Sequence, residues 1–460
     1  LFEFIPLPPA VVRSSGQAPK RYGTIDFGLG YPWTPRADIL LQAPMGAGWY
    51  AGLQARHRSL FSEEDRMRTD GRLTLEHRGK KNTFRLIALG EHLKNDYAVV
   101  DVLSSLSPSY QNYYNAGVAV ETYALNQAAG TWLYYWKSAY THAKNNMHGV
   151  GDDLPVIREN ILDIEALAGY NLSGSFSINL NAETRFASDR WTTDGNSASR
   201  AVISLFPHVI LKGDRFRVGA GLRAQYLLRP DGNKFGFFPW FDAHLTLADD
   251  WLTIFAGIKG YHALNTYQER MTENSWVFVN QLFDATVPWD VEAGFKGTIA
   301  DGLHYRLFGA YRYTKSQFFY LTQAVQQGYP SLFTLGYSDE TRYTAGGSID
   351  YHSRPFQASL SGQWHKYSLS SGTPPWHKPA WEIKAFARYN WRERIIVSAT
   401  GYWRDACAAP NWMTGNPSVT VPGFFDLGAR VEYVVKKFFG AYVFGNNLLN
   451  TDIAYFYLYP

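Results

Sequence analysis

Apolar and polar residues alternate along most of this chain. In the stretch PGFFDLGARVEYVVKKFFGAYVFGNN, every second residue from Phe425 to Val435 is apolar, and the residues between them are mostly charged or small. Side chains of a β-strand alternate between two faces, so the pattern predicts a strand with one apolar and one polar face. A short polar break at 435–437 and a second run at 439–446 complete a predicted hairpin.

The same hairpin unit recurs from residue 22 onward. Strands are predicted at 22–31, 37–43, 48–57, 71–78, 83–92, 112–124, 131–142, 160–170, 175–186, 200–211, 215–227, 236–247, 251–262, 287–298, 303–316, 340–351, 356–367, 380–391, 395–404, 424–435 and 439–446. Short turns alternate with long loops between them, and no helical period of ten residues is convincing. Outer-membrane barrels alternate short periplasmic turns with long extracellular loops in this way, whereas a soluble sandwich has no reason to do so.

The faces of the strands favour the membrane barrel over the sandwich. The apolar stripe spans about 9–11 residues in strand after strand, the length of a tilted membrane crossing. Aromatic rings stand at the ends of these stripes, for example Trp381 and Trp391, as expected for girdles at two membrane interfaces. We therefore predict an all-β fold, a transmembrane antiparallel β-barrel of about 22 strands (20 to 22).

Composition narrows the class further. Aromatic residues make up 16% of the chain, and charged residues make up 18%, against roughly 25% in soluble domains. The formal net charge of +4 is spread evenly, so no nucleic-acid partner is predicted. Cys407 is the only cysteine, which excludes a disulfide framework and a cysteine-based metal site.

Three stretches carry a resemblance to a known family. They are VPWDVEAGFKG at 287–297, the hairpin at 423–450 with its Asn-Asn-Leu-Leu-Asn ending, and IDFGLGYPWTPRADILL at 25–41. In their residues and in their order along the chain, they resemble the barrels of TonB-dependent outer-membrane receptors, in particular those of Bacteroidetes. The resemblance implies a transport protein of the Gram-negative outer membrane that imports a scarce ligand.

The family resemblance also implies a segment that this sequence does not contain. Receptors of this family carry an N-terminal plug and a short TonB-contact segment, and only 1–20 precede the first predicted strand. We expect 1–20 to be a linker or the end of a missing plug segment, and 21–460 to form the barrel. An even number of strands requires a closing strand, which could begin at Ala454 to Tyr459.

The sequence is compatible with three functions, and none of them is enzymatic. The first is ligand uptake by a TonB-dependent receptor. The second is a plugless barrel subunit of a multi-protein outer-membrane complex for protein assembly or secretion, and the third is a passive channel. Expected partners are outer-membrane lipid and lipopolysaccharide, a TonB-type energy coupler if a plug exists, and other outer-membrane proteins or surface lipoproteins. No cofactor, metal site or catalytic residue is predicted, and no pattern identifies the ligand.

Two groups of residues are candidates for contact with a ligand. Charged residues on the polar strand faces are predicted to line the lumen, where they either select an anionic substrate or form mixed ion pairs in a wet interior. They are Arg215, Arg217, Arg223, Glu292, Lys296, Arg306, Arg312, Glu382, Lys384, Arg388, Arg430 and Glu432. Aromatic residues of the long loops either stack on a ligand or partner, or pack on one another. They are Trp276, Phe319, Tyr320, Trp376 and Trp412.

Overall fold

Strands make up most of the chain that the computed structural model describes. The described residues are 23–61, 65–96, 110–124, 128–148, 156–191, 197–277, 282–322, 333–411, 418–436 and 438–457. The predicted linker at 1–20 and the loop residue Trp412 lie outside them. Within this part of the chain, no helix has the length and apolar character needed to cross a bilayer.

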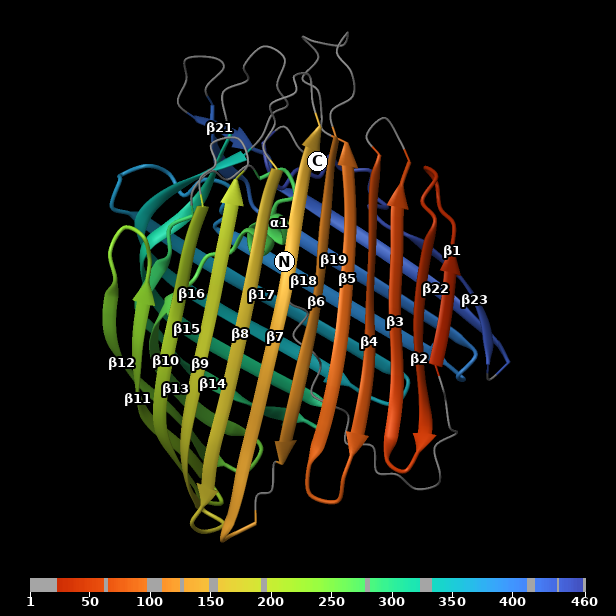
Figure 1. The fold of residues 1–460 in the computed structure, drawn as a ribbon. Helices are drawn as coiled ribbons and strands as arrows, with labels where there is room; N and C mark the ends of the chain where they lie inside the picture. Colours follow the sequence, from red (N-terminus) through yellow and green to blue (C-terminus); the bar gives the residue numbers. More distant parts are fainter. Residues whose placement is uncertain are drawn as a thin grey trace.

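The strands follow one another with few interruptions (Figure 1). The first half contains β1 (Gly23–Gly28), β2 (Arg36–Gly46), β3 (Trp49–Leu60), β4 (Arg66–Arg78), β5 (Thr83–Asp96), β6 (Tyr110–Ala124), β7 (Thr131–His148), β8 (Val156–Asn171), β9 (Phe176–Trp191), β10 (Ser197–Lys212), β11 (Phe216–Leu228), β12 (Lys234–Ala248) and β13 (Leu252–Ala263). A short helix, α1 (Tyr267–Glu273), follows. The second half contains β14 (Ala285–Ala300), β15 (Leu303–Thr322), β16 (Phe333–His352), β17 (Phe356–Leu369), β18 (Trp381–Trp391), β19 (Ile395–Arg404), β20 (Cys407–Pro410), β21 (Ser418–Val421), β22 (Phe424–Lys436) and β23 (Phe439–Gly445).

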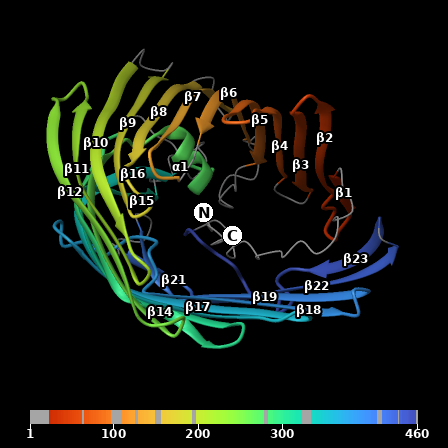
Figure 2. The ribbon, with the colours of Figure 1, turned by 90° about the horizontal axis from the view of Figure 1, so that it is seen from below.

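Consecutive strands pair antiparallel into one sheet that curls into a ring, as Figure 2 shows from below. The sheet has 21 strands, within the predicted range of 20 to 22. β19 pairs directly with β22, because β20 and β21 form a separate two-stranded sheet within the loop that joins them. The predicted all-β antiparallel fold is confirmed.

Short turns and long loops lie at opposite ends of the ring. The turn at 213–215 joins β10 to β11 at one end, whereas the 264–284 segment joins β13 to β14 at the other. We call these the turn end and the loop end. Several strands continue further toward the loop end than their apolar stripe predicts: β15 runs to Thr322 rather than residue 316, and β16 begins at Phe333 rather than residue 340.

The two faces of the sheet differ as predicted. Large apolar side chains on the outer face stay exposed, such as Val118 at 53%, Leu307 at 55% and Leu360 at 52%. In water such a surface would be costly, whereas lipid tails solvate it. The inner face is identified by its contacts, because Arg66 of β4 lies 4.9 Å from the ring of Trp276, a residue of the loop that folds into the ring.

Side chains of β1 and β2 contact side chains of β22 and β23 at a seam between the two ends of the sheet. β1 and β23 both run from the turn end to the loop end, so they are parallel to each other. The Tyr442 hydroxyl donates a hydrogen bond to the Asp26 carboxylate, and the Arg430 guanidinium lies 3.4 Å from the same carboxylate. The Arg36 guanidinium lies 4.9 Å from the ring of Phe444.

The predicted closing strand is wrong as far as its residues are described. Ala454 and Tyr457 pack against the small core of the β20–β21 hairpin, and Phe456 packs against the loop-end core. Aromatic side chains of this segment pack against buried residues inside the ring. They bury more apolar surface there than they would in an edge strand.

Candidate functional site: the loop cap and the charged lumen wall

A loop between β13 and β14 folds into the ring and carries α1 (Figure 2). The helix begins after Thr266, whose hydroxyl accepts a hydrogen bond from the backbone N–H of Glu269 at 3.3 Å. It ends where the Asn274 N–H donates to the carbonyl of Arg270 at 2.8 Å. Seven residues make too short an apolar period to be seen in the sequence. We call the described residues 264–277 and 282–284 the cap loop.

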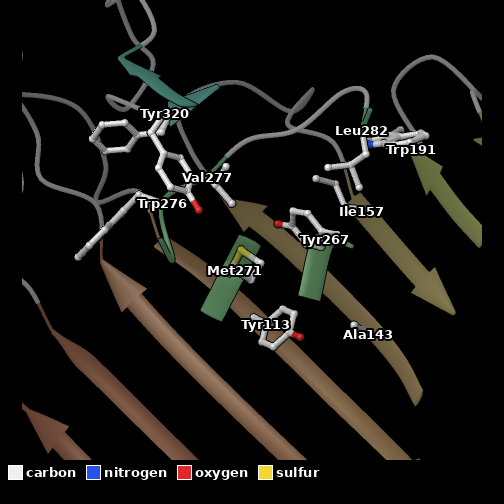
Figure 3. Close-up of a cluster of buried hydrophobic side chains, with 11 residues drawn as sticks. Tyr113, Ala143, Ile157, Trp191, Tyr267, Met271, Trp276, Val277, Leu282 and Tyr320 are labelled. Atoms are coloured by element: carbon white, nitrogen blue, oxygen red, sulfur yellow. The ribbon is translucent and has the colours of Figure 1, made fainter. Parts of the chain in front are cut away.

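The cap loop packs on the inner faces of the wall strands. Tyr267 and Met271 are 1% and 3% exposed, and they share a buried cluster with Tyr113, Ile157 and Trp191 from β6, β8 and β9 (Figure 3). Burying side chains of this size stabilises the contact by about 1.5–3 kcal/mol each. The Asn145 amide also donates to the Tyr267 hydroxyl at 2.6 Å, which satisfies a buried polar group.

Both ends of the cap loop are held by buried charges on β8, β9 and β10. Glu159 accepts hydrogen bonds from the backbone N–H groups of Tyr267 and Gln268, at 2.6 and 2.9 Å. Arg200 donates to Asp189 at 2.7 Å and to Asp284 at 2.6 Å, and all three side chains are at most 2% exposed. We call Glu159, Asp189, Arg200 and Asp284 the clasp.

The clasp holds more carboxyl groups than cations. Burial, and next the neighbouring Asp189 carboxylate, raise the pKa of Glu159 well above its ordinary value. These groups lie on the loop side of the apolar band, because outward positions beyond Phe186 on β9 are the polar Ser188 and Arg190.

Three further segments complete the core at the loop end. Val277 and Phe333 form an isolated parallel bridge, and both are fully buried. The ring of Tyr320, from the end of β15, lies 6.4 Å from that of Phe333 and 5.3 Å from that of Phe456. The C-terminal segment, the β15–β16 hairpin and the cap loop therefore share one apolar core.

The loop between β17 and β18 contributes a buried histidine. The Nδ1 atom of His377 lies 3.1 Å from the carbonyl oxygen of Tyr320, and its backbone carbonyl accepts from Arg404 at 2.6 Å. Burial lowers the pKa of His377 to about 4. Arg404 also donates to the Tyr455 carbonyl at 3.2 Å and contacts the Cys407 sulfur at 3.4 Å. Neutral His377 and charged Arg404 thus connect the 369–381 loop, the β20–β21 hairpin and the C-terminal segment.

An open cavity of about 450 Å³ lies beside the polar face of α1. Glu269, Arg270, Thr272 and Glu273 line it. The described residues contain no group of three or more histidine, cysteine or carboxylate side chains placed to hold a metal ion. The polar face of α1 therefore offers carboxylate, guanidinium and hydroxyl groups to a ligand at the loop end.

The predicted loop aromatics lie mostly inside this core. Trp276, Phe319 and Tyr320 are 8%, 4% and 4% exposed. Trp276 and Tyr320 belong to the same buried cluster, and the Phe319 ring lies 4.5 Å from the Lys378 ammonium. Trp376 is half-buried in the 369–381 loop. In this structure these rings pack against protein, so a ligand would reach Trp376 more easily than the others.

All but one of the twelve predicted lumen charges occupy inward strand positions, and six of them form mixed ion pairs. The pairs are Arg217 with Asp242, Arg306 with Glu292, Arg312 with Asp290, and Arg430 with Glu432. Glu382 accepts a hydrogen bond from the Tyr402 hydroxyl at 2.6 Å. The remaining inward residues contact rings or lie opposite polar residues of the neighbouring strand: Arg223 over Phe206, Lys296 over Phe255, Lys384 opposite Ser361 and Arg388 opposite Ser398.

Arg215 differs from the others because it lies in the β10–β11 turn. Its side chain is 62% exposed and pairs with Asp249 of the neighbouring turn at 3.2 Å. Sequence reasoning placed the strand start at residue 215, one residue too early, because Arg215 has the same parity as the inward Arg217.

Inward arginines of β3 and β4 were missed, because the stretch 58–70 was assigned to a loop. β3 runs to Leu60 and β4 begins at Arg66, so Arg58 and Arg68 lie in strands. The alternation of arginine with other residues in RMRTDGRLTL is a period-two signal that could have revealed this strand.

Comparison with solved structures places this architecture among known folds. The FrpB iron transporter from Neisseria meningitidis (F5-1 variant) superposes with a TM-score of 0.74 at 9% identity, covering 93% of this chain and 77% of that chain. The ferric-catecholate import receptor Fiu from K12 E. coli has a TM-score of 0.69 at 11% identity, covering 95% and 78%. FpvAI in complex with pyocin S2 has a TM-score of 0.69 at 12% identity, covering 93% and 69%. No protein-family model matches the chain, and no curated protein matches it by sequence.

These neighbours are TonB-dependent outer-membrane receptors, so the predicted resemblance is confirmed at the level of the fold. The chain folds as an outer-membrane β-barrel. Among these neighbours, FrpB is an iron transporter and Fiu is an import receptor. The comparison does not test the predicted similarity to receptors of Bacteroidetes.

Proposed function

We propose that this chain is the barrel of a receptor that takes up a ligand across the outer membrane, driven by a TonB-type energy coupler. The observation that carries the proposal is the receptor-type fold, which extends over 93% of this chain in the FrpB match. A fold alone does not determine function. The proposal therefore also draws support from the loop end, where buried and charged residues gather beside an open cavity.

The inward-folded cap loop suits a receptor better than a passive channel. A passive pore conducts through a lumen that stays open, whereas α1 occupies part of the lumen and is fixed there by a buried apolar core. In this proposal, the clasp and the apolar core hold the cap loop in place, and ligand binding would favour its release.

Uptake measurements in cells test the proposal. Compounds retained from growth medium by the purified full-length protein would be identified by mass spectrometry, and one of them labelled. We expect its uptake to be lost when the gene is deleted, and to be lost equally when the energy coupler is deleted. Uptake that persists without the coupler would favour a passive channel, and the absence of any retained compound would favour the subunit of a protein complex.

A further inference from the structure

Three arginines form a row across neighbouring strands on the inner face of the barrel. Arg36 of β2 lies directly opposite Arg58 of β3, and Arg58 lies directly opposite Arg68 of β4. All three share the inward parity of Arg66, which contacts the cap-loop residue Trp276. Adjacent strands are about 4.8 Å apart, so the row spans about 10 Å. We call Arg36, Arg58 and Arg68 the arginine row.

The row is unfavourable for the barrel itself. Like charges directly opposite each other on a sheet are destabilising. The next inward positions toward the turn end are Asp38 on β2, Arg56 on β3 and Asp70 on β4. Carboxylates offset part of the cost: Asp38 lies 3.3 Å from Arg36 and 3.4 Å from Arg58, Glu91 lies 2.7 Å from Arg68, and Asp26 of β1 lies 3.8 Å from Arg36.

The guanidinium groups reach further into the lumen than their acidic partners. The side chains of Arg58 and Arg68 are 62% and 46% exposed, whereas those of Asp38 and Glu91 are 27% and 17% exposed. The acids therefore sit at the wall, and they leave guanidinium N–H groups free to meet a ligand.

The surrounding wall has an excess of positive charge. Inward positions of β2 to β5, which are all described, carry more arginines than carboxylates. The arginines are Arg36, Arg56, Arg58, Arg66, Arg68, Arg72, Arg78 and Arg85, and the carboxylates are Asp38, Asp70, Glu76 and Glu91. No lysine occupies an inward position on these four strands. Arginine presents a planar fork of donors that matches carboxylate and phosphate oxygens in pairs, which a lysine ammonium cannot do.

We propose that the arginine row binds a ligand that carries two or more carboxylate or phosphate groups. This inference rests on the proposed function, because it names the chemical class of the ligand that the receptor would take up. Arg58 and Arg68 supply the open guanidinium groups, and Arg36, which is 21% exposed and packs beside Phe444, flanks them. The two anionic groups would lie a few ångströms apart, matching neighbouring strands.

Calorimetry with the purified full-length protein in detergent tests the site, with citrate and inorganic pyrophosphate as separate probes. We expect both to bind, and we expect Arg58→Gln and Arg68→Gln each to weaken binding about tenfold or more, as for loss of a charge-assisted hydrogen bond. Arg58→Lys should give an intermediate loss, because it keeps the charge but not the fork. Arg354→Gln is the matched control, since it removes the same charge from a 93% exposed turn residue, and it should bind like the wild type.

A stability readout separates binding from a structural role. Because Arg58→Gln removes like-charge repulsion, its thermal midpoint should equal or exceed that of the wild type. A clearly lower thermal midpoint in Arg58→Gln would show that the arginine row has a structural role and would overturn the inference. Three binding results would also overturn it: unchanged affinity in both glutamine variants, an equal loss of affinity in Arg354→Gln, or no binding of either probe. Absence of probe binding with coupler-dependent uptake intact would overturn only the proposed ligand class. Probe binding without coupler-dependent uptake would contradict only the proposed function.

Discussion

At the scale of single residues, the loop end depends on ionisable groups held in protonation states they would not keep in water. Burial keeps His377 neutral and raises the pKa of Glu159, so the two respond to pH in opposite directions. A histidine whose folded-state pKa is lowered loses stability as pH falls from its ordinary value toward the lowered one. A carboxyl whose folded-state pKa is raised loses stability as pH rises above its ordinary value.

His377 provides the clearest pH prediction. Its pKa falls from 6.5 to about 4 on folding, so the 369–381 loop should lose up to about 3 kcal/mol of local stability between pH 6.5 and pH 4. Hydrogen exchange of that loop, corrected for the intrinsic pH dependence of exchange, measures this loss. His377→Gln should remove most of the dependence. A loop equally protected at pH 7 and pH 4 in the wild type would contradict the assignment.

Sequence could predict the inward charges but not the clasp. Residues such as Arg217 and Arg430 are fixed by the period-two pattern of one strand, and that pattern is local. Glu159, Arg200 and Asp284 come from separate strands and a loop, and they meet only because the sheet curls and the cap loop folds back. The spacing of these residues in the sequence does not predict that they lie close together in the fold.

At the scale of elements, one end of each strand was predictable and the other was not. Turn-end boundaries agree within three residues, as for β17, which begins at Phe356 as predicted. Many strands were predicted to stop too early at the loop end, because the apolar outward stripe stops where lipid stops, although β1 ends three residues earlier than predicted. Beyond the apolar stripe, β9 continues to Trp191 with polar outward residues, held by pairing with β8 and β10 rather than by contact with lipid.

Removing the cation of the clasp should release the cap loop. Arg200→Ala leaves Asp189 and Asp284 buried without their partner, which should cost about 3–5 kcal/mol of local stability. Limited proteolysis within 264–284 would measure the release, while the barrel itself should remain folded. Arg354→Ala breaks an exposed pair and should change proteolysis little. A cap loop that resists proteolysis in Arg200→Ala would show that the apolar core alone holds it.

At the scale of the whole molecule, the outer face of the sheet meets lipid and the inner face lines the lumen. Adjacent residues of one strand should respond differently to the same substitution. Leu360 points outward and is 52% exposed, whereas Ser361 lies opposite the inward Lys384. Leu360→Lys should cost about 2–4 kcal/mol in the bilayer, and Ser361→Lys should cost far less. Urea unfolding in lipid vesicles measures both, and equal costs would contradict the assignment of the faces.

Labelling in intact cells tests the outer-membrane orientation most directly. Thr373 is exposed in the 369–381 loop, Arg354 is exposed in a short turn, and the natural Cys407 is buried and should stay unreactive. A maleimide carried on a polymer too large for porins should label Thr373→Cys in intact cells, and Arg354→Cys only after the outer membrane is permeabilised. The reverse pattern, or equal labelling of both sites in intact cells, would contradict a barrel that displays its cap loop and arginine row to the outside.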